Sequence, residues 1–325
     1  MKILFITSGY SGIYPYFEQS IQNSLLALNH TILVVTPESN PKSIEQIESF
    51  EPDFVFVFVG YKLQQDFIQY LKQKGYVLGI WFTEDPYYID ESLRLGADFD
   101  YIFSIDLGAY EYYQKIYPSK HLHHLPLGTD PDIYFPCNMP ENTIYDVCLI
   151  GYPYPERIQL VQYMLDHTSY TLILAGPFWR KFISGHYYKR LTIINKWVEP
   201  EMVRRIFHSS KIILNPHRTF NFYKNKNSLS VESKSINNRT FDIAACQGFQ
   251  LISKKADIET HFDHENEIIS YSTNEECIQL IHQFVKDEKA RKFYSQRGRE
   301  KVLKCHTFFH RVQRILNLLE KKEGG

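Results

Sequence analysis

The chain has 325 residues, of which 44% are apolar and 22% charged, which predicts a globular protein of about two domains and excludes collagen-like, low-complexity and disordered classes. No apolar run approaches the ~20 residues of a membrane span, and the N-terminus turns polar too early for a signal peptide, so we expect a cytoplasmic protein without a membrane span. Residues 1–140 carry 8 Lys and Arg against 17 Asp and Glu, whereas residues 141–325 carry 28 against 20. The acidic first half excludes a general nucleic-acid groove, and the basic second half suits a smaller anion such as a nucleoside diphosphate.

Short apolar runs alternate with segments of helical period along the first half. The runs predict strands at 2–7, 31–36, 53–59, 77–82 and 101–105. The helical periods predict helices near 16–29, 43–50, 63–75 and 108–117. Continuous runs such as FVFVFV are typical of strands buried on both faces, so this order predicts a doubly wound domain with a parallel sheet.

The proline-rich segment 121–145 interrupts this rhythm and predicts a linker. The pattern then restarts with strands expected at 145–150, 171–175, 191–194, 211–215 and 249–253. Helices are expected near 155–167, 200–208 and 239–247, and the chain reads as helical from residue 274 onward. A second doubly wound domain therefore follows the first, and the fold class is α/β.

The five cysteines are an odd number with no close pair. This usage predicts neither a disulfide framework nor a cysteine metal knuckle, so we expect small buried apolar residues.

A glycine-containing turn follows the first strand of each predicted domain. Gly9 and Gly12 lie in the first turn, where glycines permit close backbone approach and helix-terminal amides attract phosphate. The second turn contains Gly151 and Tyr154, with Arg157 in the first turn of the helix that follows. Each signal is weak alone because glycines also form ordinary turns. A cation opposes the helix dipole at this place, which favours an anion contact for Arg157.

The stretch 211–248 carries the richest chemistry. It includes a loop of some twenty residues, a length that is usually functional in compact domains, although a solvated basic loop is the alternative. Asn237 or Asn238 is expected to cap a helix with Arg239 and Asp242 in its first turn. A guanidinium matches phosphate oxygens and a carboxylate accepts from ribose hydroxyls, so these residues predict a nucleotide contact.

Six strings, which follow one another along the chain, carry a family resemblance. NNRTFDIAACQGF at 237–249, preceded by KIILNPHR and followed by KVLKCHTFFHRV, resembles the C-terminal half of the CgeB/YkvP-like spore-maturation family of GT-B glycosyltransferases. WFTEDP at 81–86, LPLGTDPDIYFP at 125–136 and DVCLIGYPYPER at 146–157 resemble the same family. The likeness therefore spans nearly the whole chain in order.

The resemblance implies a GT-B fold, with two Rossmann-like doubly wound domains facing a central cleft. Residues 1–130 would form the acceptor domain, 131–305 the nucleotide-sugar donor domain, and 306–325 a C-terminal helix that packs back on the N-terminal domain. The implied activity is metal-independent, retaining hexosyl transfer from a nucleoside-diphosphate sugar, a UDP-sugar above all, with no other cofactor. The implied acceptor is a glycan, a protein or a small molecule, including a spore-surface glycan or protein, and a homodimer is one possible state.

The resemblance also implies roles for single residues. Asp242 falls where related retaining enzymes place the second acid of an E-x7-E motif, which holds the donor ribose, whereas Lys234 occupies the place of the first acid and leaves the contact to the transferred sugar open. Arg157 and Arg239 are the cations expected to stabilise the leaving diphosphate. The full set of donor-binding candidates is Gly9, Gly12, Gly151, Tyr154, His217, Asn238, Arg239 and Asp242.

Asp85 ends the fourth strand, where ligands bind in open α/β sheets, and we expect it to be a catalytic or acceptor-orienting carboxylate with Glu84 beside it. A carboxylate that only caps the turn at Pro86 is the alternative. Among the aromatic residues, three in loops are candidates for sugar stacking: Tyr10, Tyr154 and Tyr223.

No metal site is expected. Asp98 and Asp100 form a D-x-D, the manganese motif of another glycosyltransferase fold, but they directly precede a predicted strand. His121, His123 and His124 have no acidic or cysteine ligand at metal spacing and are interpreted as structural.

Two other classes of function compete with glycosyl transfer. A non-catalytic spore-coat or carbohydrate-binding protein on a glycosyltransferase scaffold is supported by Lys234 at the acid position. A sugar-nucleotide epimerase is weaker and rests on the shared two-domain design. Hydrolysis of a nucleotide sugar separates the first from a transferase, and product analysis separates the second.

Overall fold

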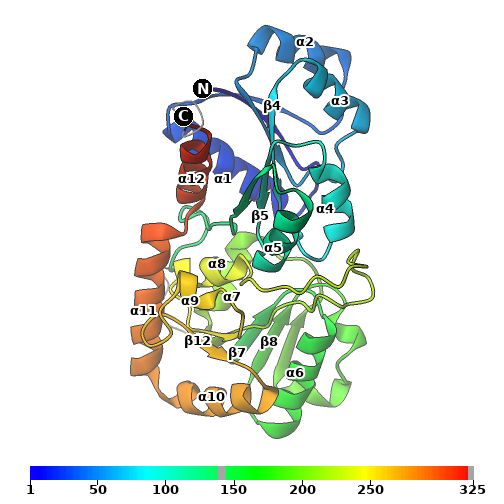
Figure 1. Ribbon diagram of the computed structural model, residues 1–325. Helices are drawn as coiled ribbons and strands as arrows, with labels where there is room; N and C mark the ends of the chain where they lie inside the picture. Colours follow the sequence, from blue (N-terminus) through cyan, green and yellow to red (C-terminus); the bar gives the residue numbers. More distant parts are fainter. Residues whose placement is uncertain (138–143, 321–325) are drawn as a thin grey trace. The chain divides into compact units, whose positions relative to one another are not determined.

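The computed structural model describes residues 1–137 and 144–320, and the chain forms two compact units (Figure 1). Unit 1 contains Met1–Leu127, Tyr223–Ser235 and the C-terminal helix, and unit 2 contains Gly128–Phe222 and Ile236–Thr307. Each is built around a six-stranded sheet in which all described pairings are parallel. The α/β class and the two doubly wound sheets predicted from buried apolar runs are confirmed.

The sheet of unit 1 has the strand order β2-β1-β3-β4-β5-β6. Its strands are β1 (Lys2–Ile6), β2 (Thr31–Val35), β3 (Phe54–Phe58), β4 (Val77–Phe82), β5 (Tyr101–Ser104) and β6 (His121–His124). Its helices are α1 (Tyr14–Ala27), α2 (Pro41–Phe50), α3 (Gln65–Gln73), α4 (Ile89–Gly96), α5 (Leu107–Ile116) and α12 (Phe308–Glu320). Every residue of β3 is buried, because helices cover both faces of the sheet at this central strand.

Two elements of unit 1 depart from the sequence analysis. The first four residues of the predicted linker form β6, which pairs with β5, and the rings of His121 and His123 stack on Tyr101 and Phe103 at 4.5 and 5.5 Å. Histidine is polar and interrupts an apolar pattern, so hydrophobicity alone does not predict this strand. The histidine rings nevertheless pack as aromatic residues do. Helix α4 (Ile89–Gly96), between β4 and β5, is also absent from the predicted elements.

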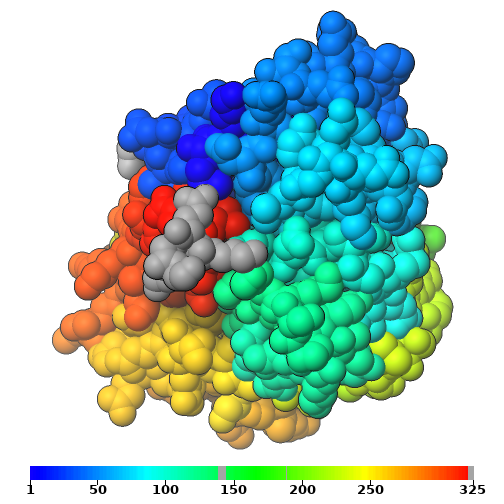
Figure 2. All heavy atoms as spheres, turned by 45° about the horizontal axis from the view of Figure 1, so that its top comes forward, coloured from blue at the N-terminus to red at the C-terminus, as the bar shows by residue number. Residues whose placement is uncertain are grey.

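Helix α12 closes the core of unit 1 from the far end of the sequence. The ring of Phe308 lies 5.5 Å from that of Phe17 on α1 and 6.4 Å from that of Trp81 on β4. An apolar stripe on this helix is buried, at Val312, Ile315, Leu316 and Leu319. Figures 1 and 2 both show α12, in red, beside the blue N-terminal segment.

The sheet of unit 2 has the order β12-β11-β10-β7-β8-β9. Its strands are β7 (Tyr145–Ile150), β8 (Leu172–Ala175), β9 (Leu191–Ile194), β10 (Ser210–Asn215), β11 (Gln250–Ser253) and β12 (Ile269–Tyr271). Its helices are α6 (Pro155–His167), η1 (Trp179–Lys181), η2 (Gly185–Lys189), α7 (Pro200–His208), α8 (Arg239–Ala245), α9 (Ile258–His261), α10 (Asn274–Lys286) and α11 (Glu288–Cys305). The sequence analysis missed β12, α9 and the two 3₁₀ helices, η1 and η2, which are too short for a periodicity to show.

A segment from the middle of the second half belongs to unit 1. We call Tyr223–Ser235 the strap; it runs past α4 and α5 in Figure 1, in lime. Asp106, 2% exposed at the start of α5, accepts hydrogen bonds from Ser233 Oγ and from the backbone amides of Lys234 and Ser235, at 3.0–3.1 Å. Its other oxygen caps α5 through the amides of Gly108 and Ala109. One buried carboxylate therefore both caps a helix and binds the strap.

Candidate active site

The carboxyl edge of the second sheet gathers most of the predicted donor-site residues. Gly151 follows β7 and Gly176 follows β8, with φ of 143° and 146°. A Cβ at Gly176 would lie 2.2 Å from the carbonyl oxygen of Gly151, and one at Gly151 would lie 2.4 Å from Arg157 Nη1. Only glycine fits at both places, so the loops after β7 and β8 approach each other with bare backbone.

Arg157 connects two of these loops. Its Nε donates to the carbonyl oxygen of Pro216, just after β10, at 3.0 Å, and its Nη1 donates to that of Tyr152 at 3.2 Å. The guanidinium lies 5.2 Å from the centre of the Tyr154 ring. Arg157 thus lies close to both Gly151 and Tyr154, and backbone acceptors hold the cation in one place.

His217 extends the connection toward α8. It is 6% exposed, and burial, followed by the charges of Lys255 and Arg157, holds its pKa well below the ordinary value. Its Nε2 accepts from the amide of Asn237 at 3.2 Å, and its Nδ1 lies 2.7 Å from Ser253 Oγ. A neutral imidazole therefore ties the end of β10 to the start of α8, and Nδ1 carries its proton.

At the start of α8, the structure selects one of the two predicted capping residues. Asn238 occupies the N-cap position but makes no side-chain cap, whereas Asn237 Oδ1 accepts from the amide of Thr240 at 3.2 Å. Asn237 also donates to Asn215 Oδ1, at the end of β10. The side chain of Asn237 therefore caps the helix, and that of Asn238 points to Asp242, with Nδ2 at 3.4 Å from Oδ2.

Arg239 and Asp242 differ in their hydrogen-bond partners and in their burial. No hydrogen bond or ion pair joins the half-buried Arg239 side chain to any residue within 1–137 or 144–320. Asp242 is 4% exposed, and its Oδ1 accepts from Thr129 Oγ1 at 2.8 Å. Burial raises the pKa of Asp242 to about 7, while the Thr129 hydroxyl and the Arg239 charge oppose the rise.

At the carboxyl edge of the first sheet, Asp85 is a buried carboxylate with its own partners. It is 1% exposed, and its oxygens accept from Ser92 Oγ, Ser104 Oγ and Tyr113 Oη at 2.7, 2.7 and 2.9 Å. Burial raises its pKa to about 6, against the three hydroxyl donors. This environment suits a carboxylate that positions the loop after β4 rather than one that touches a substrate.

Glu84 lies beside Asp85 and is less buried. Its Oε1 accepts from Tyr14 Oη at 2.7 Å, and burial together with this carboxylate raises the pKa of the Tyr14 phenol. The Tyr14 ring packs 5.4 Å from that of Tyr10, over which Lys62 Nζ lies at 4.3 Å. A carboxylate among aromatic rings is the arrangement that carbohydrate-binding surfaces use.

Gly9 and Gly12 lie in the loop after β1, with φ of 69° and 75°. The carbonyl oxygen of Gly9 accepts from Lys62 Nζ at 2.6 Å, and a Cβ there would lie 2.8 Å from Pro37. They belong to unit 1, together with Asp85, whereas the other donor-site candidates belong to unit 2.

Lys234, at the place of the first acid, lies on the strap. Its Nζ is 2.6 Å from Glu111 Oε2 on α5, and this pair raises its pKa. The lysine is therefore part of how the strap binds unit 1. Tyr223, the third predicted stacking residue, begins the strap and is 81% exposed.

The residues that were considered as metal ligands in the sequence analysis have structural partners. Asp98 pairs with Lys72 at 2.6 Å, and Asp100 Oδ2 accepts from the amide of Leu78 at 2.9 Å. Burial lowers the pKa of His123 to about 4, as expected for a ring stacked on a strand. Among the described residues, no group of three or more His, Cys, Asp or Glu side chains is placed to hold a metal.

The carboxyl edge of the second sheet also has a cavity that was not predicted from the sequence. The residues that follow β9 line a cavity of about 520 Å³, with Trp197 44% and Met202 42% exposed. Lys196, Glu199 and Arg205 also line it. Its volume falls within the range of small-molecule sites. The available signal was a tryptophan in a polar loop between a strand and a helix.

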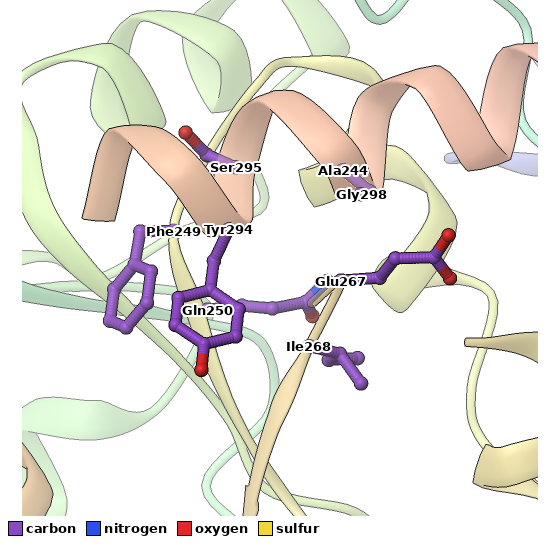
Figure 3. A pocket seen from close by; sticks show the side chains of 9 residues that line it. Ala244, Phe249, Gln250, Glu267, Ile268, Tyr294, Ser295 and Gly298 are labelled. Carbon is purple, nitrogen blue, oxygen red and sulfur yellow. The ribbon is translucent and has the colours of Figure 1, made fainter. Parts of the chain in front are cut away.

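Two other cavities of unit 2 are poor candidates. The one in Figure 3, where Tyr294 and Gly298 of α11 face Gln250, has a volume of about 10 Å³, enough for one water at most. A cavity of about 340 Å³ includes Ser210 and Phe249, where β10 and β11 begin. It therefore lies at the amino edge of the sheet, away from the predicted residues.

Comparison with known proteins decides the family. Residues 157–317 match a family described as glycosyl transferase-like. The spore protein CgeB of Bacillus subtilis (strain 168) is 34% identical over 257 residues, which cover 77% of this chain and 79% of the relative. The chain belongs to the CgeB family.

Solved structures add the fold. Sucrose-phosphate synthase from Thermosynechococcus elongatus superimposes with a TM-score of 0.70 at 11% identity, over 100% of this chain and 99% of that one. Anabaena HepE in complex with UDP and glucose gives 0.66 at 11% identity, over 98% and 99%. This CgeB-family chain is thus a glycosyltransferase of GT-B fold, as the resemblance implied. No helix of the described residues is both long and apolar enough to cross a membrane.

Proposed function

We propose that this CgeB-family glycosyltransferase uses a UDP-sugar as donor and binds it at the carboxyl edge of the second sheet. The observation that carries the proposal is the Arg239 guanidinium, which makes no hydrogen bond or ion pair with the described residues, next to the buried Asp242 carboxylate. A cation without a protein partner beside a carboxylate suits a ligand with both phosphates and hydroxyls. The UDP and glucose in the HepE structure, a protein of the same fold, support UDP.

In the proposed reaction, the bond between the anomeric carbon and the β-phosphate oxygen breaks while an acceptor hydroxyl oxygen bonds to that carbon, and the hydroxyl proton passes to the departing diphosphate. Negative charge grows on the departing diphosphate. Arg239 and the backbone-anchored Arg157 would stabilise it, with the bare backbone at Gly151 allowing close approach. Tyr154, His217 and Asn238 complete the donor site; His217, which is neutral, would fix the loop without adding charge.

We assign the cavity after β9 to the nucleobase. Its volume of about 520 Å³ accommodates a pyrimidine, and the exposed Trp197 offers a stacking surface. Asp242 would accept from the ribose hydroxyls. Trp197→Ala should therefore weaken UDP binding in calorimetry while leaving the melting temperature of the free protein unchanged.

On the acceptor side, we propose Glu84 as the carboxylate that contacts the acceptor and Asp85 as the residue that positions its loop. The three hydroxyl donors of Asp85 fix the backbone that carries Glu84. Tyr10 and Tyr14 supply aromatic surface for a sugar, and Gly9 and Gly12 allow the loop after β1 to approach it. A carbohydrate hydroxyl is thus the favoured acceptor.

We further propose that transfer is metal-independent and retaining, and that the protein works in the cytoplasm. Arginine side chains supply the positive charge that a divalent metal would supply. The resemblance to retaining enzymes at Asp242 supports retention. The free thiols of all five cysteines, Cys137, Cys148, Cys246, Cys277 and Cys305, support a reducing compartment. The name of the Bacillus relative supports a spore-surface glycan or protein as the acceptor.

The test begins with the donor. A thermal-shift screen of UDP, GDP, ADP and dTDP should show stabilisation by UDP, about 2.7 kcal/mol at 100 times its dissociation constant. UDP release from UDP-glucose, UDP-galactose and UDP-N-acetylglucosamine is then measured with and without EDTA, and NMR of the product reports the anomeric configuration. Stabilisation by GDP or dTDP alone would overturn the donor proposal, and strict dependence on manganese would overturn the proposal of metal independence.

The ion pair between Lys234 and Glu111 keeps one competing function open. If the first acid is needed for transfer, the chain binds nucleotide sugars without turning them over, as a carbohydrate-binding protein on a glycosyltransferase scaffold. UDP binding without UDP release from any donor, with or without an acceptor mixture, would favour this second function.

A further inference from the structure

Thr129 occupies an unusual place for a polar side chain. It is the second residue of unit 2, follows directly on the end of unit 1 at Leu127, and is completely buried. Its amide donates to the carbonyl oxygen of His306 at 3.0 Å, and it forms an isolated parallel bridge with Thr307. The backbone of Thr129 is therefore fixed by residues 306–307, which are far away in the sequence. The fixed backbone sets the direction of the Thr129 side chain.

The hydroxyl of this fixed residue reaches the candidate donor site. Thr129 Oγ1 donates to Asp242 Oδ1 at 2.8 Å, while Asp242 Oδ2 has, among the described residues, only the long contact of 3.4 Å from Asn238 Nδ2. Thr129 thus engages one carboxylate oxygen and leaves the other to a weak donor. Charge-assisted hydrogen bonds of this length are strong, and a buried one sets the orientation of the group that it touches.

We propose that Thr129 is a positioning residue for donor binding: its hydroxyl holds Asp242 Oδ1 and so presents Oδ2 to the ribose hydroxyls. This inference rests on the proposed function, because it requires Asp242 to contact the donor. No sequence motif singled out Thr129, which lies in the segment LPLGTDPDIYFP without any catalytic pattern.

A change in the pKa of Asp242 would distinguish a positioning role of Thr129 from a purely stabilising one. Burial raises the pKa of Asp242, and the facing groups are Thr129 and Arg239, which lower it, and Asp130, which raises it. Cys246, on the next turn of α8, is also coupled to Asp242, and its own pKa is raised well above the ordinary value. Removing the Thr129 hydroxyl takes away a lowering contribution, so the pKa of Asp242 moves up.

The experiment measures UDP affinity by calorimetry from pH 5.5 to 8.5 on the full chain. Thr129→Val should weaken UDP binding about tenfold at pH 7.5, the range expected for one hydrogen bond to a charged group. The midpoint below which affinity falls should shift to higher pH. Thr129→Ser, which keeps the hydroxyl, should restore both.

A matched control exists in the same unit. Thr171 Oγ1 donates to Asp146 Oδ2 at 3.0 Å, at the amino end of β8. Thr171→Val also removes a threonine hydroxyl from a carboxylate, but it should leave UDP affinity and its pH midpoint unchanged. Melting temperatures of all variants show how much stability each hydroxyl contributes.

A double-mutant cycle separates this inference from the donor assignment. In Asp242→Asn, the added Thr129→Val should cost little further UDP affinity, because the hydroxyl acts through the carboxylate. If Asp242→Asn binds UDP as tightly as the native protein, the donor assignment itself fails. If Asp242→Asn weakens binding but Thr129→Val shifts neither affinity nor the pH midpoint, the positioning role is overturned and the donor site stands.

Discussion

The carboxyl edges of the two sheets use their charged residues in opposite ways. In unit 1, Asp85 and Asp106 are buried and surrounded by hydroxyl and amide donors. In unit 2, Arg239 makes no hydrogen bond or ion pair with the described residues, and Asp242 has one short hydrogen bond. The first edge therefore uses its carboxylates to build loops, whereas the second keeps a charge that we propose for a ligand.

The sharpest test of this contrast removes the Arg239 charge. Arg239→Ala should lower turnover about 100-fold to 1000-fold, because a guanidinium aimed at the leaving diphosphate gains interaction energy as negative charge develops. The melting temperature should fall only slightly, since no described hydrogen bond is lost and only the favourable charge beside Asp242 is removed. Steady-state kinetics and thermal melting on one preparation measure both.

The matched control for that variant is Arg297→Ala. Arg297 is an exposed arginine on α11 that lies over the Phe293 ring at 4.9 Å. Its removal should affect neither quantity. A folded Arg239→Ala protein with near-normal turnover would show that the second edge does not hold its charge for catalysis.

The opposite expectation holds for Asp106 in unit 1. Asp106→Ala leaves five donors without their acceptor, three of them on the strap, and should lower the free energy of unfolding by about 3–5 kcal/mol. Released strap should be cut faster by trypsin at Lys224 and Lys226, which limited proteolysis and mass spectrometry would detect.

Asp90→Ala is the milder comparison for the strap. The Asp90 carboxylate accepts from the amide and the hydroxyl of Ser228, near the exposed end of the strap. We expect a smaller loss of stability and a smaller increase in cleavage. Equal protection of the strap in Asp106→Ala and in the native protein would remove Asp106 as its anchor.

Asp242 shares a property with each edge. It is buried like the carboxylates of unit 1, yet we propose that it binds the donor. Its folded pKa of about 7 lies above the unfolded value of 3.8, so its stabilising contribution is complete below about pH 4 and is lost as the pH rises to about 7. Asp242→Asn should remove this loss. Its free energy of unfolding should gain about 3 kcal/mol on the native protein between pH 4 and pH 8.

Urea unfolding at several pH values measures the effect, and Asp146→Asn is the control of opposite sign. Lys211 and Thr171 hold the pKa of Asp146 below its usual value, so that variant should lose stability relative to the native protein as the pH rises. Asp242→Asn should also raise the KM for donor more than it lowers turnover, since a ribose hydrogen bond exists in ground and transition states alike. A flat stability difference would place Asp242 in a more solvated site.

The sequence predicted the two parallel sheets because buried strands such as β3 are apolar throughout, a signal that needs no partner to be recognised. It missed β6, since the stacking of His121 on Tyr101 is a tertiary contact. The position of the strap was not predicted for the same reason. Nothing local in residues 223–235 indicates that Asp106, more than a hundred positions away, accepts hydrogen bonds from them.

The candidate site was predicted unevenly. Arg157, Arg239 and Asp242 could be proposed from the sequence because guanidinium and carboxylate groups near helix starts have a chemical meaning of their own. Asp85 was placed at the correct strand end, but its burial beneath three hydroxyls depends on α4, β5 and α5, which only the fold brings together. Thr129 and Trp197 were missed because their significance depends on a neighbour and on a cavity.

The smallest expected effect concerns Lys234. Its pair with Glu111 is partly exposed, with side chains 35% and 42% accessible, and such pairs contribute about 0–1 kcal/mol. Exchanging the charges, Lys234→Glu with Glu111→Lys, keeps the pair and puts an acid at the position where the resemblance implies one. Stability should change by less than ~1 kcal/mol, and Lys234→Glu alone should be the less stable protein because two carboxylates then face each other. Turnover of the exchanged protein should stay within about threefold of the native value, since a residue held to α5 serves the structure of unit 1. A large gain in turnover would instead show that the lysine had taken the place of a catalytic acid, and the charged residues of the strap would then belong with those that unit 2 keeps for its ligand.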